Sequence, residues 1–257
     1  MQLSLLGPID RWFALAPATR QVDWLRGASF AHRGVHGGNV AENSRSAFAE
    51  ALVRGHGIEC DVQKSSDGEA VVFHDFELDR LTGESGKVSH RSASTLTTTA
   101  LKGTTDAIQT LRQMLDQVSG AVPILIEVKS RKERPVAAIC LAVRRALEGY
   151  RGPHAIMSFD PRVSRWFARH SPLTVRGLVV TEENDKALLG RLRRHLWLWI
   201  ARPHFLAYDI RDLPSRFAAF QRKRGFPITT WTVRSAELRE RASIHADAPI
   251  AEGAGLP

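Results

Sequence analysis

Short apolar runs alternate along almost the whole chain with longer stretches of helical periodicity. The runs that read as strands lie at 28–32, 58–62, 124–128, 155–159, 176–180, 205–210, 228–233 and 244–247. The helix-like stretches lie at about 46–55, 106–118, 133–148, 161–170, 184–199, 214–224 and 235–242. This alternation is typical of a parallel sheet whose strands are joined by helical crossovers. It predicts one α/β domain over residues 1–257, a TIM (β/α)8 barrel.

One apolar run does not fit the parallel series. Only a tight turn at Asp67-Gly68 separates Val71–His74 from the second strand, whereas a parallel neighbour needs a crossover of about a dozen residues. We therefore expect an antiparallel hairpin arm that returns His74 toward the strand ends. The arm belongs to an insertion of about 63–105, rich in Ser, Thr and Gly, which we expect to form a small cap.

Two carboxylates stand one residue apart in the second strand, within Gly57-Ile58-Glu59-Cys60-Asp61-Val62. Because a strand alternates its faces, Glu59 and Asp61 share one side. Acids held that close repel each other unless one is protonated or a cation lies between them. A hard divalent metal is the simplest remedy. An exposed face with both acids in water is the alternative that this segment alone leaves open.

Three further apolar runs end in side chains of complementary chemistry. A charge at the end of a buried strand needs a partner, and active sites of α/β barrels form at the carboxyl ends of the strands. We therefore expect these side chains to converge with Glu59 and Asp61. They comprise two imidazoles, a guanidinium, a third acid and an ammonium: His32, His74, Arg33, Glu127 and Lys129.

These fragments resemble the glycerophosphodiester phosphodiesterase family, within the PI-phospholipase-C-like phosphodiesterases. No single piece is specific, but the pieces occur in family order over almost the whole chain. They are His32-Arg33-Gly34, Glu42-Asn43-Ser44, Glu59-Cys60-Asp61-Val62, Asp67-Gly68, Val71 to Asp75, Leu78 to Gly83, Glu127-Val128-Lys129, Ser158-Phe159-Asp160 and Trp231-Thr232-Val233.

The resemblance implies a role for each matched residue. It implies that His32 and His74 are the catalytic acid-base pair. It also implies that one divalent cation, Mg²⁺ or Ca²⁺, is bound by the three acids Glu59, Asp61 and Glu127.

Four further residues are candidates for substrate binding. Arg33 and Lys129 would neutralise the phosphate, since a guanidinium offers two parallel donors. Glu42 would hold an active-site cation or bind the metal. Trp231 either walls the glycerol side of the site or packs in the barrel.

The implied activity is hydrolysis of glycerophosphodiesters to glycerol 3-phosphate and an alcohol. A lysophospholipase-D-like hydrolase at a membrane surface and a noncatalytic binding barrel are the alternatives. Departures from the family pattern, Ala41 before Glu42 and Arg234 after Val233, leave the alcohol open. The choice of ion, the assignment of acid and base to the histidines, and the oligomeric state also stay open.

A net charge of +9 raises the question of an anionic partner. Basic and aromatic residues mix most densely at 191–199, as in a helix at a membrane interface. The favoured interpretation is outer-layer packing of Leu192, Leu196 and Trp199 with the arginines in water. Peripheral membrane contact is the alternative. We expect a small phosphodiester as substrate and no nucleic acid.

The remaining features predict a cytoplasmic protein without a disulfide framework. The first residues lack the basic start and long apolar core of a secretory signal, and no apolar run reaches the roughly 18 residues of a membrane span. The two cysteines, Cys60 and Cys140, are predicted to be buried and inert.

Overall fold

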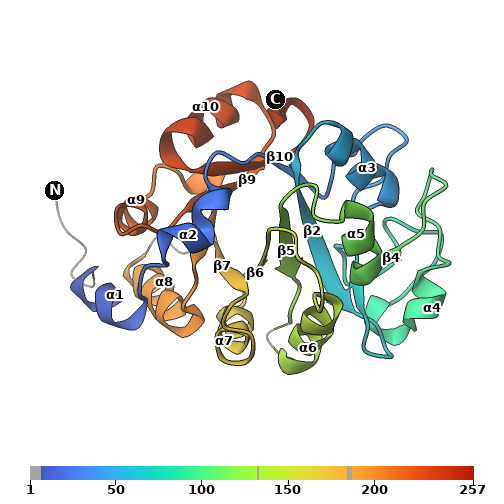
Figure 1. Cartoon of the computed structure of the whole chain (residues 1–257), viewed down its shortest axis with the longest axis horizontal. Coiled ribbons are helices and arrows are strands. Elements are labelled where there is room, and N and C mark those ends of the chain that lie inside the picture. Colours follow the sequence, from blue (N-terminus) through green and yellow to red (C-terminus); the bar gives the residue numbers. More distant parts are fainter. Residues whose placement is uncertain (1–6, 132, 184–186) are drawn as a thin grey trace. The chain divides into compact units, whose positions relative to one another are not determined.

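The computed structural model describes residues 7–131, 133–183 and 187–257 (Figure 1). The chain divides into two compact units, one formed by Phe30–His154 and the other by Met1–Ser29 together with Ala155–Pro257. In the described residues, eight parallel strands alternate with helices in the element order of a (β/α)8 barrel. The extent of the predicted single domain stays a prediction.

The unit Phe30–His154 is built on three parallel strands. β2 (Gly57–Lys64) pairs with β1 (Phe30–His32) on one side and with β5 (Ile124–Val128) on the other. Helices α3 (Arg45–Val53), α5 (Leu111–Val118) and α6 (Ala137–Ala146) belong to the same unit. The Ser44 side chain begins α3 by accepting a hydrogen bond from the amide of Ala47.

A second group of short elements follows β2. β3 (Ala70–Val72) runs antiparallel to β2, and β4 (Gln109–Thr110) runs antiparallel to β3. Between them lie the 3₁₀ turn Val88–His90 and helix α4 (Ala93–Leu96). This region has a small core of its own that includes Phe73, Leu78 and Leu96.

The helix predicted at 106–118 is shorter in the structure. Gln109 and Thr110 pair with Val72 and Val71, so their backbone groups are taken by the sheet. Thr110 then caps α5 in a capping box with Gln113, and the helix begins at Leu111. The predicted helix start at 106 is therefore wrong, because pairing with the distant strand β3 determines the conformation of Gln109 and Thr110.

The other unit contains five strands that pair in parallel in chain order, each with the next. The strands are β6 (His154–Ser158), β7 (Val175–Val180), β8 (Phe205–Asp209), β9 (Ile228–Val233) and β10 (Ala248–Ala251). The helices are α1 (Gly7–Phe13), α2 (Thr19–Val22), α7 (Pro161–His170), α8 (Leu188–Ala201), α9 (Arg216–Lys223) and α10 (Ala236–His245). Tyr208, Phe226 and Ile228 lie in its core.

The last strand lies later in the chain than predicted. The run 244–247 does not form a strand, because helix α10 continues to His245 and the strand starts at Ala248. Asp247 lies in the connection, where its carboxylate accepts hydrogen bonds from the amide of Ile228 and from Arg222. A buried acid with these partners cannot be read from the local apolar pattern.

Candidate active site

Three carboxylates meet on one face of the unit Phe30–His154. Asp61 on β2 is in register with Glu127 on β5, and Glu59 lies two residues before Asp61. One carboxylate oxygen from each acid lies within 4.8 Å of the others. Glu59 is 1% exposed and Asp61 is 2% exposed, so the alternative of two acids in water is excluded.

The intervening residue points the other way, as strand alternation requires. Cys60 is in register with Ile126 and is fully buried. Burial raises the pKa of its thiol well above the usual value, and the neighbouring carboxylates act in the same direction. Cys140 is buried in α6. The predicted burial of both cysteines is confirmed, and their lack of reactivity stays a prediction.

The three acids do not share one electrostatic environment. Burial raises the pKa of Glu59 well above its usual value, and the charges of Asp61 and Glu127 add to this. Burial also acts to raise the pKa of Asp61, but Lys129 and Arg33 outweigh it and lower that pKa. The site therefore holds more negative charge than its own cations compensate, which is the condition that a bound cation relieves.

Lys129 lies against the acid group. Its Nζ atom is 2.9 Å from Oε1 of Glu127 and 3.4 Å from Oδ1 of Asp61. Burial alone would lower the pKa of Lys129, but Glu127 and Asp61 raise it to about 12. The ammonium therefore stays charged, as the prediction of a cation on this face requires.

Arg33 reaches three acids from the loop after β1. Its backbone amide donates to Oε2 of Glu59 at 3.1 Å, its Nη1 donates to Glu42 at 2.7 Å, and its Nε lies 3.2 Å from Oδ2 of Asp61. Arg33 adopts a positive φ of 57°, and a Cβ on the following Gly34 would lie 2.8 Å from Ala47. The glycine thus permits the close turn that aims Arg33 at the acids.

His74 follows β3 and is held by its neighbour in the chain. The amide of Phe73 donates to the carbonyl of Asp61 at 3.0 Å, which places His74 beside the acid group. Nδ1 of His74 lies 2.6 Å from Oδ1 of Asp75. Arg80 is the strongest influence on Asp75, and with His74 it lowers the pKa of that carboxyl to about 2.

A chain of ion pairs connects His74 to Arg33. Arg80 donates from Nε to Asp75 at 2.5 Å and from Nη2 to Glu42 at 2.8 Å, and Glu42 accepts from Arg33. Glu42 thus bridges two arginines. These ion pairs are the contacts that the first predicted role of Glu42, to hold a site cation, requires, and the role itself stays a prediction.

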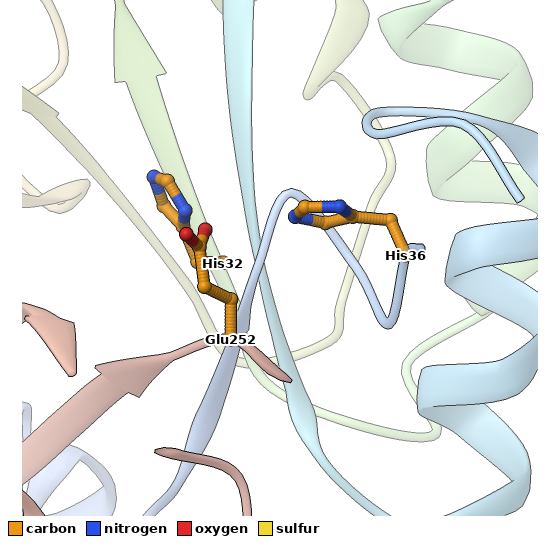
Figure 2. A group of neighbouring side chains, drawn as sticks. All are labelled: His32, His36 and Glu252. Carbon is orange, nitrogen blue, oxygen red and sulfur yellow. The ribbon is translucent and has the colours of Figure 1, made fainter. Parts of the chain in front are cut away.

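His32 is the last residue of β1 and is in register with Glu59 on β2. Side chains in register on adjacent strands point to the same face, so His32 shares the face of the acids. Figure 2 draws His32 together with His36 in the loop that follows β1, and with Glu252, which directly follows β10.

Three residues of this site were not among the predicted ones. Asn43 exchanges two hydrogen bonds with Asp61, from Nδ2 to the carboxylate at 3.0 Å and from the Asp61 amide to Oδ1 at 3.2 Å. Asp75 and Arg80 orient His74 as described above. All three lie inside the matched motifs, so position within a motif was the available signal, but their partners are set by the fold.

Trp231 belongs to the other compact unit. Its Nε1 donates to the carbonyl of Ala207 at 3.0 Å, and its ring meets Phe159 edge to face with centroids 5.3 Å apart. These contacts show packing at β9. A contact with substrate stays a prediction.

The segment 191–199 lies in α8 with a different face buried than predicted. Arg194 is buried and its Nη2 lies 3.4 Å from Oε2 of Glu182, while Nδ1 of the buried His195 lies 2.8 Å from Asp10. Leu192 and Leu196 are 43% and 49% exposed. The prediction that these leucines pack inward with Arg194 in water is wrong, because the buried Asp10 and the half-buried Glu182 pair with His195 and Arg194. The predicted packing of Trp199 against the core is confirmed.

The fold and the polar side chains at its strand ends define the TIM-barrel class of enzymes. Residues 32–249 match the model of the glycerophosphoryl diester phosphodiesterase family. The chain belongs to this family.

Solved structures and a curated relative agree with this assignment. A phosphodiesterase from Oleispira antarctica, solved in complex with the product sn-glycerol-3-phosphate, has a TM-score of 0.75 at 21% identity and covers 88% of this chain and 93% of that one. A glycerophosphodiester phosphodiesterase from Thermotoga maritima has a TM-score of 0.67 at 27% identity, covering 87% and 94%. The predicted TIM barrel is confirmed.

The curated match is local. A glycerophosphodiester phosphodiesterase from Bacillus altitudinis is 50% identical over 60 residues, which are 23% of this chain and 24% of that protein. The aligned stretch thus spans about a quarter of the relative's length.

Proposed function

We propose that the protein is a metal-dependent phosphodiesterase that hydrolyses glycerophosphodiesters to glycerol 3-phosphate and an alcohol. The observation that carries the proposal is the acid group: three carboxylates within 4.8 Å of one another, beside Lys129, Arg33 and His74. The product bound to the Oleispira antarctica structure supports the choice of substrate.

The acid group fits a hard divalent cation. Mg²⁺ and Ca²⁺ prefer oxygen ligands, and the group offers carboxylates without a thiol, because Cys60 points to the opposite face. Glu59, Asp61 and Glu127 would hold the cation. When bound, the cation supplies positive charge to the non-bridging oxygens of the phosphodiester.

The protein's own groups perform the remaining steps. Arg33 and Lys129 carry charge at the acid group and position the phosphate. One of the two histidines accepts the proton of the attacking water as its oxygen bonds to phosphorus. The other donates a proton to the alcohol oxygen as the P–O bond breaks. Asp75 holds Nδ1 of His74, so Nε2 of that ring is the atom that exchanges a proton.

Glycerophosphocholine hydrolysis tests this function. We expect turnover with Mg²⁺ or Ca²⁺, no turnover with EDTA, and a loss of roughly a hundredfold to ten-thousandfold in kcat for His74→Ala. His90→Ala is the matched control, since His90 is exposed in the same insertion. Turnover that resists EDTA, or that is equal in the two variants, would contradict the mechanism.

We also propose that one face of the other unit contacts anionic membranes. The face consists of exposed apolar and cationic side chains of α1, α8 and the residues beside them, and we name it the α1/α8 face. Trp12 is 85% exposed and Leu189 is 79% exposed. The other members are Arg11, Leu15, Leu188, Arg191, Leu192, Arg193 and Leu196.

The positive charge of the α1/α8 face favours an anionic membrane as its partner. Within α1 and α8 the one acid is Asp10, which is buried between Nδ1 of His195 and Nε1 of Trp199 at 2.8 and 2.7 Å. The exposed charges of these two helices are therefore all positive. A surface with exposed apolar side chains and arginines matches the interface of an anionic bilayer. None of the helices in the described ranges is long and apolar enough to cross a membrane.

Vesicle co-sedimentation tests the membrane contact. Each arginine near an anionic surface contributes about 1 kcal/mol, so Arg191→Glu/Arg193→Glu should weaken binding to phosphatidylglycerol vesicles by at least tenfold. Arg216→Glu/Arg241→Glu, with exposed arginines on α9 and α10, is the control. Equal binding of both variants would exclude the contact. A contact would favour lysophospholipids as the substrate.

A further inference from the structure

Four arginines gather where helices α7 and α8 end, beside the amino ends of β7 and β8. The two helices pack against each other, and the two strands pair in the same unit. Arg165 and Arg169 lie on α7, Arg176 is the second residue of β7, and Arg202 is the residue that follows α8. We name this group the β7/β8 arginine cluster.

Arg176 is the inner member and connects the two helix ends. Its Nε donates to the carbonyl of Arg202 at 2.9 Å, and its Nη1 donates to the carbonyl of Pro172 at 3.3 Å. Arg176 is only 9% exposed. A carbonyl oxygen carries no full negative charge, so these two contacts hold the guanidinium without neutralising it.

His204 lies beside Arg176 and contributes an unpartnered nitrogen. The amide of His204 donates to the carbonyl of Arg176 at 2.7 Å. His204 is 9% exposed, and its Nδ1 is buried without a hydrogen-bond partner in the described part of the chain. A buried polar atom in this state points to a bound water or ion.

Strand alternation places Arg176 and His204 on the side of the sheet that faces the helices. Leu178 and Leu206, two residues further along the same strands, lie in one core cluster with Leu198 of α8. Residues two positions apart on a strand share a face. The two polar side chains therefore lie in the layer where α7 and α8 end.

The neighbouring charges that act on Arg165, Arg176 and His204 are positive. Desolvation, with the charges of Arg169 and Arg202, lowers the pKa of Arg165. Burial, with the charge of Arg202, lowers the pKa of Arg176 to about 10, and burial with Arg176 lowers the pKa of His204 to about 4. None of the acids in the described ranges forms an ion pair with these four arginines.

Two features of the fold supply negative charge near these strands, and neither compensates the cluster. The carboxyl end of a helix carries roughly half a negative charge, so the ends of α7 and α8 offset about one of the four positive charges. Glu182 lies beyond the opposite end of β7, roughly 20 Å away at about 3.3 Å per residue, and pairs with Arg194. A surplus of about three positive charges stays.

We propose that the β7/β8 arginine cluster binds a phosphate group, carried by free phosphate or by a phosphomonoester. The proposal is independent of the proposed function. A phosphate dianion offsets most of the surplus charge, and its oxygens accept hydrogen bonds from guanidinium groups and from Nδ1 of His204. Because Arg176 and His204 are nearly buried while Arg169 and Arg202 are exposed, a small free phosphate suits the site best.

Isothermal titration with inorganic phosphate tests the site on the purified protein. EDTA is present, so that no divalent cation draws phosphate to the acid group. We expect saturable binding by the wild type, and Arg165→Gln/Arg202→Gln should weaken it about tenfold or more, because charged donors are lost. Arg216→Gln/Arg241→Gln, at exposed positions of α9 and α10, should bind as the wild type does. No binding, or equal binding by both double variants, would overturn the proposal.

His204 provides a readout inside the site. Nitrogen-15 NMR should show that phosphate shifts the Nδ1 resonance of His204 in the wild type but not in Arg165→Gln/Arg202→Gln. The resonances of His90, an exposed histidine of the other unit, should stay unchanged in both. Phosphate binding that leaves His204 unchanged would refute this location of the site.

Vesicles of phosphatidic acid separate a lipid headgroup from free phosphate as the source of the phosphate group. We expect Arg165→Gln/Arg202→Gln to co-sediment with these vesicles as the wild type does, because a headgroup fixed in a bilayer does not reach the nearly buried Arg176 and His204. Weaker co-sedimentation of this variant would support the site with a lipid phosphomonoester as its ligand.

Discussion

Nδ1 of His74 lies 2.6 Å from Oδ1 of Asp75, although the two residues are adjacent in the chain. The contact is possible because β3 ends at Val72, before these two residues. Nε of Arg80 donates a hydrogen bond to Oδ2 of Asp75 at 2.5 Å. A carboxylate with a pKa of about 2 is ionised at neutral pH and accepts from Nδ1–H. The pair therefore selects the tautomer of His74 with an unprotonated Nε2.

Replacement of this carboxylate should impair catalysis without loss of fold. In Asp75→Asn an amide no longer favours one tautomer of His74, so kcat should fall roughly tenfold to a hundredfold. Nitrogen-15 NMR of the imidazole should show a change in tautomer. Asp116→Asn, an exposed acid on α5, is the control. An unchanged His74 spectrum in Asp75→Asn would contradict this role.

Arg80 should act through its geometry as well as its charge. Its Nε and Nη2 donate to Asp75 and its Nη1 and Nη2 donate to Glu42, an arrangement that a lysine ammonium cannot reproduce. We expect Arg80→Gln to lower kcat about tenfold, and Arg80→Lys to recover only part of that loss. Metal affinity, measured by calorimetry, should stay the same in both. Full activity in Arg80→Lys would show that charge alone suffices.

Lys129 should oppose metal binding while it favours substrate binding. Its ammonium forms ion pairs with Glu127 and Asp61, two of the proposed metal ligands. Lys129→Gln should therefore bind Mg²⁺ as tightly as the wild type or more tightly, and its kcat/KM should fall at least tenfold because the phosphate loses a cation. Lys102→Gln, at an exposed position of the insertion, is the control. Weaker Mg²⁺ binding in Lys129→Gln would contradict the prediction.

His204 should make folding stability depend on pH. Burial, aided by Arg176, lowers the pKa of His204 to about 4 from an ordinary value of 6.5. As pH falls, His204 is therefore protonated near pH 6.5 in the unfolded chain but only near pH 4 in the folded chain. The stabilisation is complete above pH 6.5 and is lost as pH falls to 4, by roughly 2 to 3 kcal/mol.

Urea unfolding between pH 4 and pH 7.5 measures this effect. The free energy of unfolding of His204→Gln should fall less steeply with decreasing pH than that of the wild type. His170→Gln, an exposed histidine at the end of α7, should follow the wild type. Parallel curves for wild type and His204→Gln would show that His204 does not carry the dependence.

Much of the acid group could be predicted from the sequence, because its placement depends on local geometry. Strand alternation places Glu59 and Asp61 on one face whatever the rest of the chain does, and β5 adds Glu127 in register. The alternation of strands and helices likewise predicted the barrel. Both patterns depend on residues close together in the chain, so they can be recognised in the sequence without knowledge of the tertiary structure.

Tertiary structure decided everything that depends on a partner far along the chain. Arg80 and Glu42 are 38 residues apart, and Asp10 meets His195 across 185 residues. The second contact sets which face of α8 is buried and so exposes Leu192 and Leu196. A buried charge must find its counterpart, and this energy exceeds the preference of a leucine for the interior, so the apolar pattern of a single segment cannot determine the outcome.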